Sequence, residues 1–243
     1  LMLLGEGLFD YQDACGDPTA FSQDLQRESL SLASAWKWNE VRVTGVADAS
    51  PFGGYWNRWA GGQDFASAPR RPAQAPPLPR QHPRYARRWR QAEALGIRLQ
   101  EEASPSNRRA VLGWLLEHKA ERFGVNNVLQ PLACLWLEMM VENEPELTEL
   151  WSLRQGDAIL SALLCWRGLA VRSAYTISYD LRAAELSPGV LLLYAVVCRS
   201  AKEQMDFDFL TGEQNFKRQF ATETTRLLRF HCARTQLHEC RPS

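Results

Sequence analysis

The sequence has no excess of charge of either sign and no long apolar run. Its 28 basic residues balance 28 acidic ones, so its overall charge does not attract nucleic acid or an anionic membrane surface. No apolar stretch approaches the roughly 18 residues that a membrane-spanning helix needs, and no signal-peptide pattern opens the chain. We therefore expect a soluble, cytoplasmic protein that has no transmembrane segment and does not bind DNA.

The sequence also has few of the cysteine and histidine arrangements that bind metals. The six cysteines are scattered, and none forms a Cys-x-x-Cys pair or a Cys/His cluster at zinc spacing. His231-Cys232 and His238-x-Cys240 are only weak metal-ligand patterns. We expect no metal site, and we expect reduced thiols that are in part buried like small apolar side chains.

The strongest local pattern begins at Ser187-Pro188-Gly189. Serine is a good N-cap and proline suits the first helical turn, so these residues predict the start of a helix that runs to about Lys202. The helix begins with apolar residues on all sides, which predicts burial against a sheet. The free backbone N–H groups of such a helix start attract anions, phosphates included.

A strand and a lysine follow this helix. Residues 205–210 alternate at period two, which predicts a strand with Asp206 and Asp208 on one face. Thr211-Gly212 is a turn. Lys217 comes after it, flanked in sequence by phenylalanines.

The order and spacing of these motifs resemble the CelD-like branch of the GNAT acyltransferases. That branch shows a spaced signature, SPG … DF … G-E-x-YK, which is matched here by Ser187-Pro188-Gly189, Asp206-Phe207, Gly212-Glu213 and Phe216-Lys217. The motif Phe216-Lys217-x-x-Phe220 is more similar to the corresponding motif of the FemAB-type peptidoglycan aminoacyl transferases, which are similar in fold. The resemblance extends over roughly residues 84–229 and, more weakly, over residues 1–50.

The preceding residues agree with the fold that this resemblance implies. Residues 147–154, 157–166 and 169–179 predict three antiparallel strands joined by tight turns. Strands, then helix, then strand is the order of the GNAT core, in which two neighbouring parallel strands diverge and acyl-CoA enters the gap. We expect an α/β (α+β) fold of the GNAT-like acyl-CoA N-acyltransferase type, with a mixed central sheet flanked by helices.

The resemblance also predicts how the chain is divided. Residues 1–60 are expected to be the remnant of a first GNAT-like lobe, because Asp10-Tyr11-Gln12-Asp13 resembles a passage from the middle of such a lobe. That lobe would therefore be truncated. Residues 61–83 contain six prolines and predict an extended linker. Residues 84–243 are expected to form the GNAT-like acyltransferase domain.

Three helices are predicted before the strands of that domain. The helix of residues 84–96 carries four arginines and offers either a solvated face or a contact for an anionic ligand. Ser104-Pro105 caps the second helix, on which His118 and Arg122 share a face. The third, residues 127–143, has a wide apolar face that we expect to be core.

GNAT chemistry is the direct attack of an amine on a thioester. It needs an acceptor for the amine proton, donors for the developing oxyanion and a cradle for the CoA pyrophosphate. Backbone N–H groups at the helix start are expected to form that cradle. The expected cofactor-binding residues are Ser187, Gly189, Val190 and Leu191.

Four residues are candidates for catalysis. The resemblance implies that Lys217 steadies charge during acyl transfer, as a lysine does at the matching place in FemAB-like proteins. Asp208 is the first candidate for the base and Glu213 the second, although Asp208 could equally be salt-bridged to an arginine as scaffold. Tyr179 could protonate the leaving thiolate or merely cover the pocket.

We therefore expect an N-acyltransferase that moves an acyl group from acyl-CoA or acetyl-CoA to an amine of a small molecule or cell-envelope precursor, such as a sugar. Two alternatives stay open: a degenerate, non-catalytic binding or scaffold protein of polysaccharide biosynthesis, and a FemAB-like enzyme that uses aminoacyl-tRNA. A tRNA partner is not expected, because the sequence lacks the coiled-coil arm of many FemAB proteins and is not basic.

Overall fold

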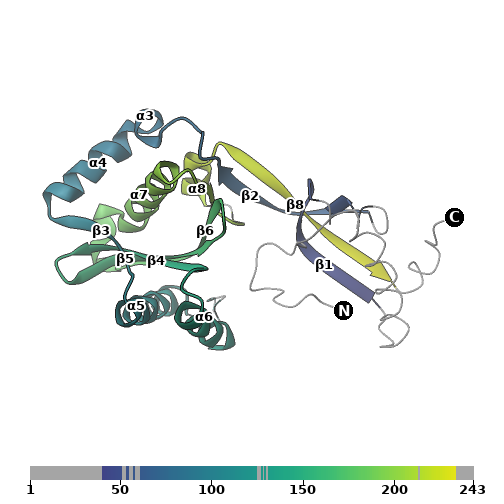
Figure 1. Cartoon of the computed structure of the whole chain (residues 1–243), viewed down its shortest axis with the longest axis horizontal. Helices are drawn as coiled ribbons and strands as arrows, with labels where there is room; N and C mark the ends of the chain where they lie inside the picture. Colours follow the sequence, from purple (N-terminus) through teal and green to yellow (C-terminus); the bar gives the residue numbers. More distant parts are fainter. Residues whose placement is uncertain are drawn as a thin grey trace. The chain divides into compact units, whose positions relative to one another are not determined.

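The computed structural model describes residues 40–50, 53–54, 57, 61–124, 127, 129, 131–212 and 214–233. The chain divides into two units, one of Leu1–Ala68 with Thr224–Ser243 and the other of Pro69–Glu223. Figure 1 shows the elements of both units in the colours of the sequence. The second unit contains most of the elements that the sequence predicts for an acyltransferase.

This unit is built on a mixed sheet in which the strand order is β7-β6-β5-β4-β3. The strands are β3 (Ile97–Glu101), β4 (Thr148–Gln155), β5 (Ala158–Arg167), β6 (Val171–Tyr179) and β7 (Asp206–Asp208). Neighbouring strands are antiparallel except β6 and β7, which run parallel. The end of β2 (Gln63–Arg71) pairs antiparallel with β7. The predicted three-strand meander and mixed sheet are therefore confirmed.

Helices cover both faces of this sheet (Figure 1). The layer on one face consists of α4 (Pro83–Ala94) and α7 (Pro188–Lys202), and the layer on the other consists of α5 (Pro105–Phe123) and α6 (Pro131–Asn143). The described residues of this unit also form three short helices: α3 (Leu78–Gln81), η2 (Leu181–Leu186) and α8 (Asn215–Phe220). Helix α7 buries a continuous run of residues 191–197, which confirms the prediction of a helix buried against the sheet.

A buried ion network joins β4, β6 and α7. The Arg172 side chain is fully buried and donates to both carboxylate oxygens of Glu149, which is also buried. The same guanidinium donates to Ser200 Oγ at 2.7 Å and to a carboxylate oxygen of Glu203 at 2.8 Å. Because Arg172 lies within the β6 segment that pairs with β7, the network anchors the strand where the parallel pair is formed.

Part of the segment predicted to be a linker has regular structure. Residues 61–83 contain β2 and α3, and the buried Arg71 ties them together. Its guanidinium donates to the carbonyl of Pro76, to Gln81 Oε1 at 2.8 Å and to the carbonyl of Phe220 at 2.8 Å. Pro69, the one proline within β2, does not prevent pairing there, because its carbonyl accepts from the Phe209 amide at 3.0 Å. The division into remnant lobe, linker and domain stays a prediction.

Helix α6 buries a narrower face than the sequence suggested. Its buried side chains are Ala133, Leu137 and Val141, a stripe of one residue per turn. Leu132 and Met139, which we expected in the core, are 81% and 58% exposed. The expectation of a wide buried face was therefore wrong, since α6 presents only this stripe to its neighbours.

In the other unit, β1 (Glu40–Ala47) pairs antiparallel with β8 (Glu223–Ala233). Val43 and Val46 of β1 and Leu228 and Phe230 of β8 are buried. The predicted lobe remnant also includes residues 1–39, which lie outside the described residues. Within the described part of the chain, no helix has the length and apolar character needed to cross a membrane.

Candidate active site

The two parallel strands of the sheet part after three residue pairs. Residues 171–173 of β6 pair with residues 206–208 of β7, and β6 then continues to Tyr179 while β7 ends. The chain turns away from β7 at Leu210, which has a φ of 55°. The Asp208 carboxylate stabilises this turn, because its Oδ1 accepts from the Leu210 amide at 2.7 Å. Beyond residue 173, β6 therefore borders a gap that β7 does not fill.

A cavity of about 110 Å³ lies beside β6 at this gap. Residues 174–177 of β6 form one wall, and Phe209 after β7 and Lys217 of α8 contribute to another. Lys119 of α5 and Leu193 of α7 also line it, so side chains reach the cavity from both helix layers. This arrangement is expected where two strands diverge and the side chains of both layers meet between them.

Two lysines give the cavity a positive character. Lys119 Nζ donates to Thr176 Oγ1 at 2.6 Å, and Lys217 Nζ donates to the Thr211 carbonyl. Burial, followed by the charges of Arg122 and Lys217, lowers the pKa of Lys119 from 10.5 to about 8. None of the described residues that line the cavity is acidic. Cations therefore converge here without a carboxylate in the described lining.

The start of α7 lies at the far end of the same strand. Ile177, which lines the cavity, and Tyr179 are the side chains nearest to the position that a Cβ atom on Gly189 would take. The amides of Val190 and Leu191 both donate to the Ser187 carbonyl at 3.1 Å. Pro188 has no N–H group, so the Gly189 amide is the first-turn N–H group that does not donate to the Ser187 carbonyl. The backbone N–H groups expected to bind the CoA pyrophosphate are thus reduced to that of Gly189.

Ser187 does not cap this helix as predicted. Its backbone is left-handed, with a φ of 50°, and its side chain makes no capping hydrogen bond. Instead, the Arg88 guanidinium of α4 donates to Ser187 Oγ at 3.2 Å and to the Leu186 carbonyl at 3.1 Å. The Ser187 hydroxyl thus bonds to one arginine of the predicted Arg-rich helix and not to the amides of α7.

The structure brings together some of the predicted catalytic residues and not others. Lys217 lines the cavity, and Tyr179 stands at the end of the same strand with the Arg122 guanidinium carbon 4.7 Å from its ring centre. Asp208 is 6% exposed and is not among the residues that line the cavity, and its Oδ1 accepts from the Leu210 amide; its role as base or scaffold stays a prediction. Glu213 lies outside the described residues.

The aromatic neighbours of Lys217 have different surroundings. Phe216 lines the cavity together with the lysine. Phe220 is fully buried and packs instead on Tyr85 and Tyr194, with ring centres 5.1 and 6.2 Å apart. The expected pair of flanking aromatics is therefore reduced to Phe216, because Phe220 faces the core under α4 and α7.

Sequence reasoning missed Lys119, although the sequence carries a signal for it. Leu112 and Leu115 are buried on α5, and Lys119 follows Leu115 by four positions. A residue at that spacing lies on the same helix face as the leucines. A lysine on the buried stripe of a helix needs a polar partner or a function. Its neighbour His118 is structural in its contacts, since its ring stacks on Trp114 at 3.9 Å.

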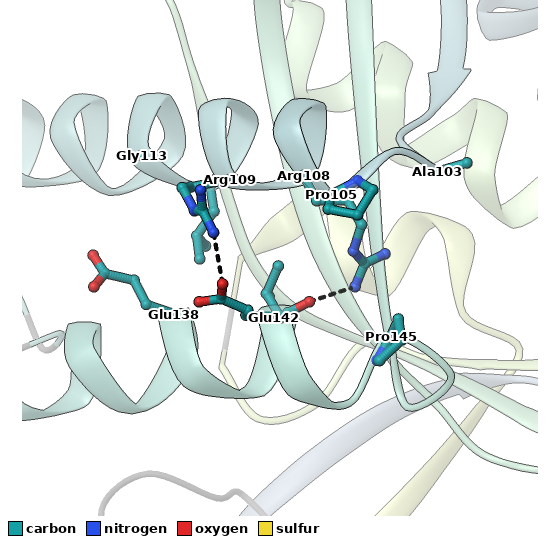
Figure 2. Close-up of a pocket in the computed structure, with 10 residues that line it drawn as sticks. Ala103, Pro105, Arg108, Arg109, Gly113, Glu138, Glu142 and Pro145 are labelled. Carbon is teal, nitrogen blue, oxygen red and sulfur yellow. Dashed lines mark hydrogen bonds and ion pairs between the residues drawn. The ribbon is translucent and has the colours of Figure 1, made fainter.

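A larger pocket, of about 470 Å³, lies between α5 and α6 (Figure 2). Two of its arginines have partners within the same pair of helices. Arg109 pairs with Glu142 at 2.6 Å, and Arg108 donates to the Val141 carbonyl at 3.3 Å. It is separate from the gap between β6 and β7, and its lining comes from the two helices and their adjoining loops. We therefore place the candidate active site at the β6–β7 gap. Among the described residues, no group of His, Cys, Asp and Glu could hold a metal ion.

A mixed sheet whose parallel strands part beside the start of a buried helix defines a transferase fold of the GNAT class. Residues 80–218, more than half of the chain, match the family described as acetyltransferase (GNAT) domain. The chain belongs to this family. The comparison with curated proteins found no match.

Three solved structures have a similar fold over most of this chain. The C-terminal domain of a protein described as a lysylphosphatidylglycerol synthetase from Agrobacterium fabrum has a TM-score of 0.64 at 11% identity, over 92% of this chain and 77% of that one. FemX has a TM-score of 0.64 at 10% identity, over 92% and 79%. The structure titled L-PGS from Bacillus licheniformis has a TM-score of 0.59 at 12% identity, over 88% and 74%. At these identities the likeness shows the fold alone.

Proposed function

We propose that the chain is an N-acyltransferase that moves an acyl group from acyl-CoA to an amine of a small molecule or cell-envelope precursor, such as an amino sugar. One observation carries this proposal: the cavity at the β6–β7 gap and the Gly189 helix start lie along one strand and share Ile177. A thioester in the gap would place its acyl group near Lys217, while its phosphates would meet the Gly189 amide and Arg88.

The residues then divide the chemistry between them. The acceptor nitrogen forms a bond to the acyl carbon, the carbon–sulfur bond breaks, and the amine loses a proton. The Lys217 ammonium group would stabilise the negative charge that develops on the acyl oxygen. The Tyr179 hydroxyl would return a proton to the thiolate that leaves. Asp208 or Glu213 would take the amine proton.

An aminoacyl donor is the second candidate. Two observations support it: the structural similarity to FemX over 92% of the chain, and the resemblance of residues 216–220 to the FemAB motif. The same cavity and the same lysine would serve an aminoacyl ester, since the attack on the carbonyl carbon is alike. The non-catalytic alternative differs from both, because it predicts no turnover with any donor.

The test is a binding and turnover measurement on the purified chain. Calorimetry should show saturable binding of acetyl-CoA, and release of free CoA thiol should increase when amino sugars are added. Thiol release that does not depend on the amine would indicate hydrolysis rather than transfer. The absence of binding at millimolar acetyl-CoA in a chain that melts cooperatively would reject the acyl-CoA function. Turnover with an aminoacyl ester alone would then select the second candidate.

A further inference from the structure

The pocket between α5 and α6 takes no part in the proposed transfer, and its walls are largely apolar. Its volume of about 470 Å³ lies within the roughly 300–1,000 Å³ that small-molecule sites occupy. On the α6 side the lining runs from Glu138 to Pro145, which corresponds to roughly 10 Å at the rise of a helix. The apolar side chains in the lining are those of Ala103, Pro105, Leu112, Val141 and Pro145. The pocket can therefore hold a small organic molecule with an apolar body.

Gly113 stands in the interior of α5, where the fold itself does not require a glycine. Its backbone is part of the helix, and nothing lies within 4 Å of the position that its Cβ atom would take. A glycine in the interior of a helix is less favourable than an alanine. Because Gly113 lines the pocket, its missing side chain leaves space there. A molecule bound in the pocket would account for that space.

Arg108 forms the polar end of the pocket. Its side chain is 7% exposed, and Figure 2 shows its guanidinium group pointing from α5 into the space between the two helices, beside Pro145. The hydrogen bonds that it donates to described residues come from Nη2 and reach the carbonyls of Val141 and Thr148 and the Thr148 hydroxyl. Its Nε has no hydrogen-bond partner among the described residues. The guanidinium group therefore bonds to neutral oxygen atoms through one of its nitrogens.

The surroundings of Arg108 favour a negatively charged group beside it. Burial lowers the pKa of Arg108, and the charges of Glu101 and Glu149 oppose this effect only in part. A carboxylate binds a guanidinium group through charge-assisted hydrogen bonds, and these are stronger where water is excluded. A ligand whose carboxylate reaches Arg108 would therefore stabilise the buried charge.

The two glutamates in the lining oppose such a ligand only weakly. Glu142 is paired with Arg109 at 2.6 Å, so its charge is compensated within the pocket wall. Glu138 is exposed and stands at the end of the pocket away from Arg108 (Figure 2). Water and salt screen the charge of an exposed carboxylate. The end of the pocket at Arg108 thus differs in charge from the end at Glu138.

We propose that the α5–α6 pocket binds a small molecule that carries a carboxylate on an apolar chain, such as a medium-chain fatty acid. The carboxylate accepts hydrogen bonds from Arg108, and the chain lies against Leu112 and Val141 in the space that Gly113 leaves. The residues that line this pocket differ from those that line the β6–β7 cavity. The inference therefore concerns a second site and does not depend on the proposed transfer.

The direct test is calorimetry on the folded chain with octanoate, at concentrations below those at which it forms micelles. Octanoate should bind at one saturable site, and octanol should bind at least about tenfold more weakly because it lacks the charge. The affinity should rise roughly fourfold for each methylene group added between hexanoate and octanoate. Equal affinities for octanoate and octanol, or no saturable binding of octanoate at millimolar concentration, would overturn the proposal.

A substitution at Gly113 tests whether the ligand lies in this pocket. Gly113→Leu should abolish octanoate binding because its side chain fills the pocket, and it should melt no lower than the wild type because leucine favours a helix. Ala110→Leu is the matched control, at an exposed position of the same helix outside the lining, and it should bind octanoate as the wild type does. Wild-type binding by Gly113→Leu would contradict the assignment to this pocket.

A substitution at Arg108 tests the role of its charge. Arg108→Gln keeps a side-chain N–H donor but removes the positive charge, so the preference for octanoate over octanol should fall to about twofold or less. This preference is a ratio measured within one protein, so a moderate loss of stability does not change its meaning. An unchanged preference in Arg108→Gln, with near-ultraviolet circular dichroism like that of the wild type, would show that another group binds the carboxylate and would overturn the proposal.

Discussion

The ring of Tyr179 lies against Gly189, so that a Cβ atom at position 189 would come within 3.2 Å of Tyr179 Cδ1. The last residue of β6 and the first turn of α7 are thereby in contact across the end of the candidate active site. Such a distance is tighter than ordinary van der Waals contact. A glycine is therefore needed at this place for the space it leaves, and not for an unusual backbone conformation.

Gly189→Ala tests this contact. The added methyl group should displace the Tyr179 ring by a few tenths of an ångström and weaken acetyl-CoA binding several-fold, and Gly189→Leu should weaken it more. Gly113→Ala is the matched control, because nothing lies within 4 Å of its Cβ position in α5. That control should leave binding unchanged and stabilise the fold by about 0.5–1 kcal/mol. Equal calorimetric affinities for Gly189→Ala and wild type would remove Gly189 from the site.

Lys217→Ala should lower kcat by roughly a hundredfold or more and leave acyl-CoA affinity nearly unchanged. The reason is that a cation acting on the developing oxyanion contributes to the transition state and little to the bound thioester. Lys217→Arg should restore little activity, since the guanidinium group is planar and larger. Steady-state kinetics with thermal melts would distinguish this from a surface lysine. Wild-type turnover by the alanine variant would contradict a catalytic role.

The free energy of unfolding should depend on pH through the ionisation of Lys119. Its folded pKa of about 8 lies below the ordinary 10.5, mainly because of burial. Between these two values the unfolded chain holds a proton that the folded chain has released, so the contribution of this group to stability rises with pH across that window. Lys119→Met should flatten the rise in denaturant titrations at pH 7.5–10.5, whereas the control Lys202→Met, at an exposed lysine of α7, should retain it. A wild-type slope in Lys119→Met would show that the lysine is not buried as described.

Arg172→Met should destabilise the chain by about 3 kcal/mol, because the buried Glu149 would lose its buried partner and keep only the ion pair with Arg167, whose side chain is 45% exposed. Arg109→Met is the control, since its ion pair with Glu142 is exposed, and it should change stability by less than about 1 kcal/mol. Chemical denaturation followed by far-ultraviolet circular dichroism measures both. If Arg172→Met loses no more stability than the control, water screens the charges of the Arg172–Glu149 network.

Arg71→Met should expose the segment between β2 and α4 to proteolysis. The substitution removes three hydrogen bonds, to Pro76, Gln81 and Phe220, that hold α3 in place. A non-specific protease should then cut residues 72–82 faster than in the wild type, with little change in global melting temperature. Arg80→Met, at an exposed residue of α3, should be cut at the wild-type rate. If the wild type is already cut there as fast as the variant, Arg71 does not restrain the segment.

Local patterns in the sequence were sufficient to predict the central strands and helices. The turns Gln155-Gly156 and Arg167-Gly168 divide the meander, and Gly96 ends α4 with a φ of 79°. The strand β2 was missed because its alternation is weak and the prolines that follow it suggested a linker. Its pairing with β7 joins residues far apart in sequence, and a pattern read locally carries no information on such contacts.

Part of the candidate site could also be predicted from local sequence motifs. Lys217 and Gly189 stand in recognisable motifs, and the structure places Lys217 in the lining of the cavity and Gly189 beside Tyr179 at the end of β6. Lys119 stands in no motif and becomes visible only when α5 is packed on β6. The surroundings of Asp208 and Ser187 depend on tertiary contacts, with Leu210 and Arg88 respectively, that no spacing rule encodes.

The order of the strands has a consequence for how the chain folds. The meander of β4, β5 and β6 closes through short turns, so its contacts are local and are expected to form early. The strand β7 reaches its place only when α7 has crossed the sheet, and its partner Arg70 is 136 positions away from Asp206. Loop closure of that length is slow and costs entropy. The cavity between β6 and β7 should therefore be completed in the last steps of folding, and its ligand should bind only the finished molecule.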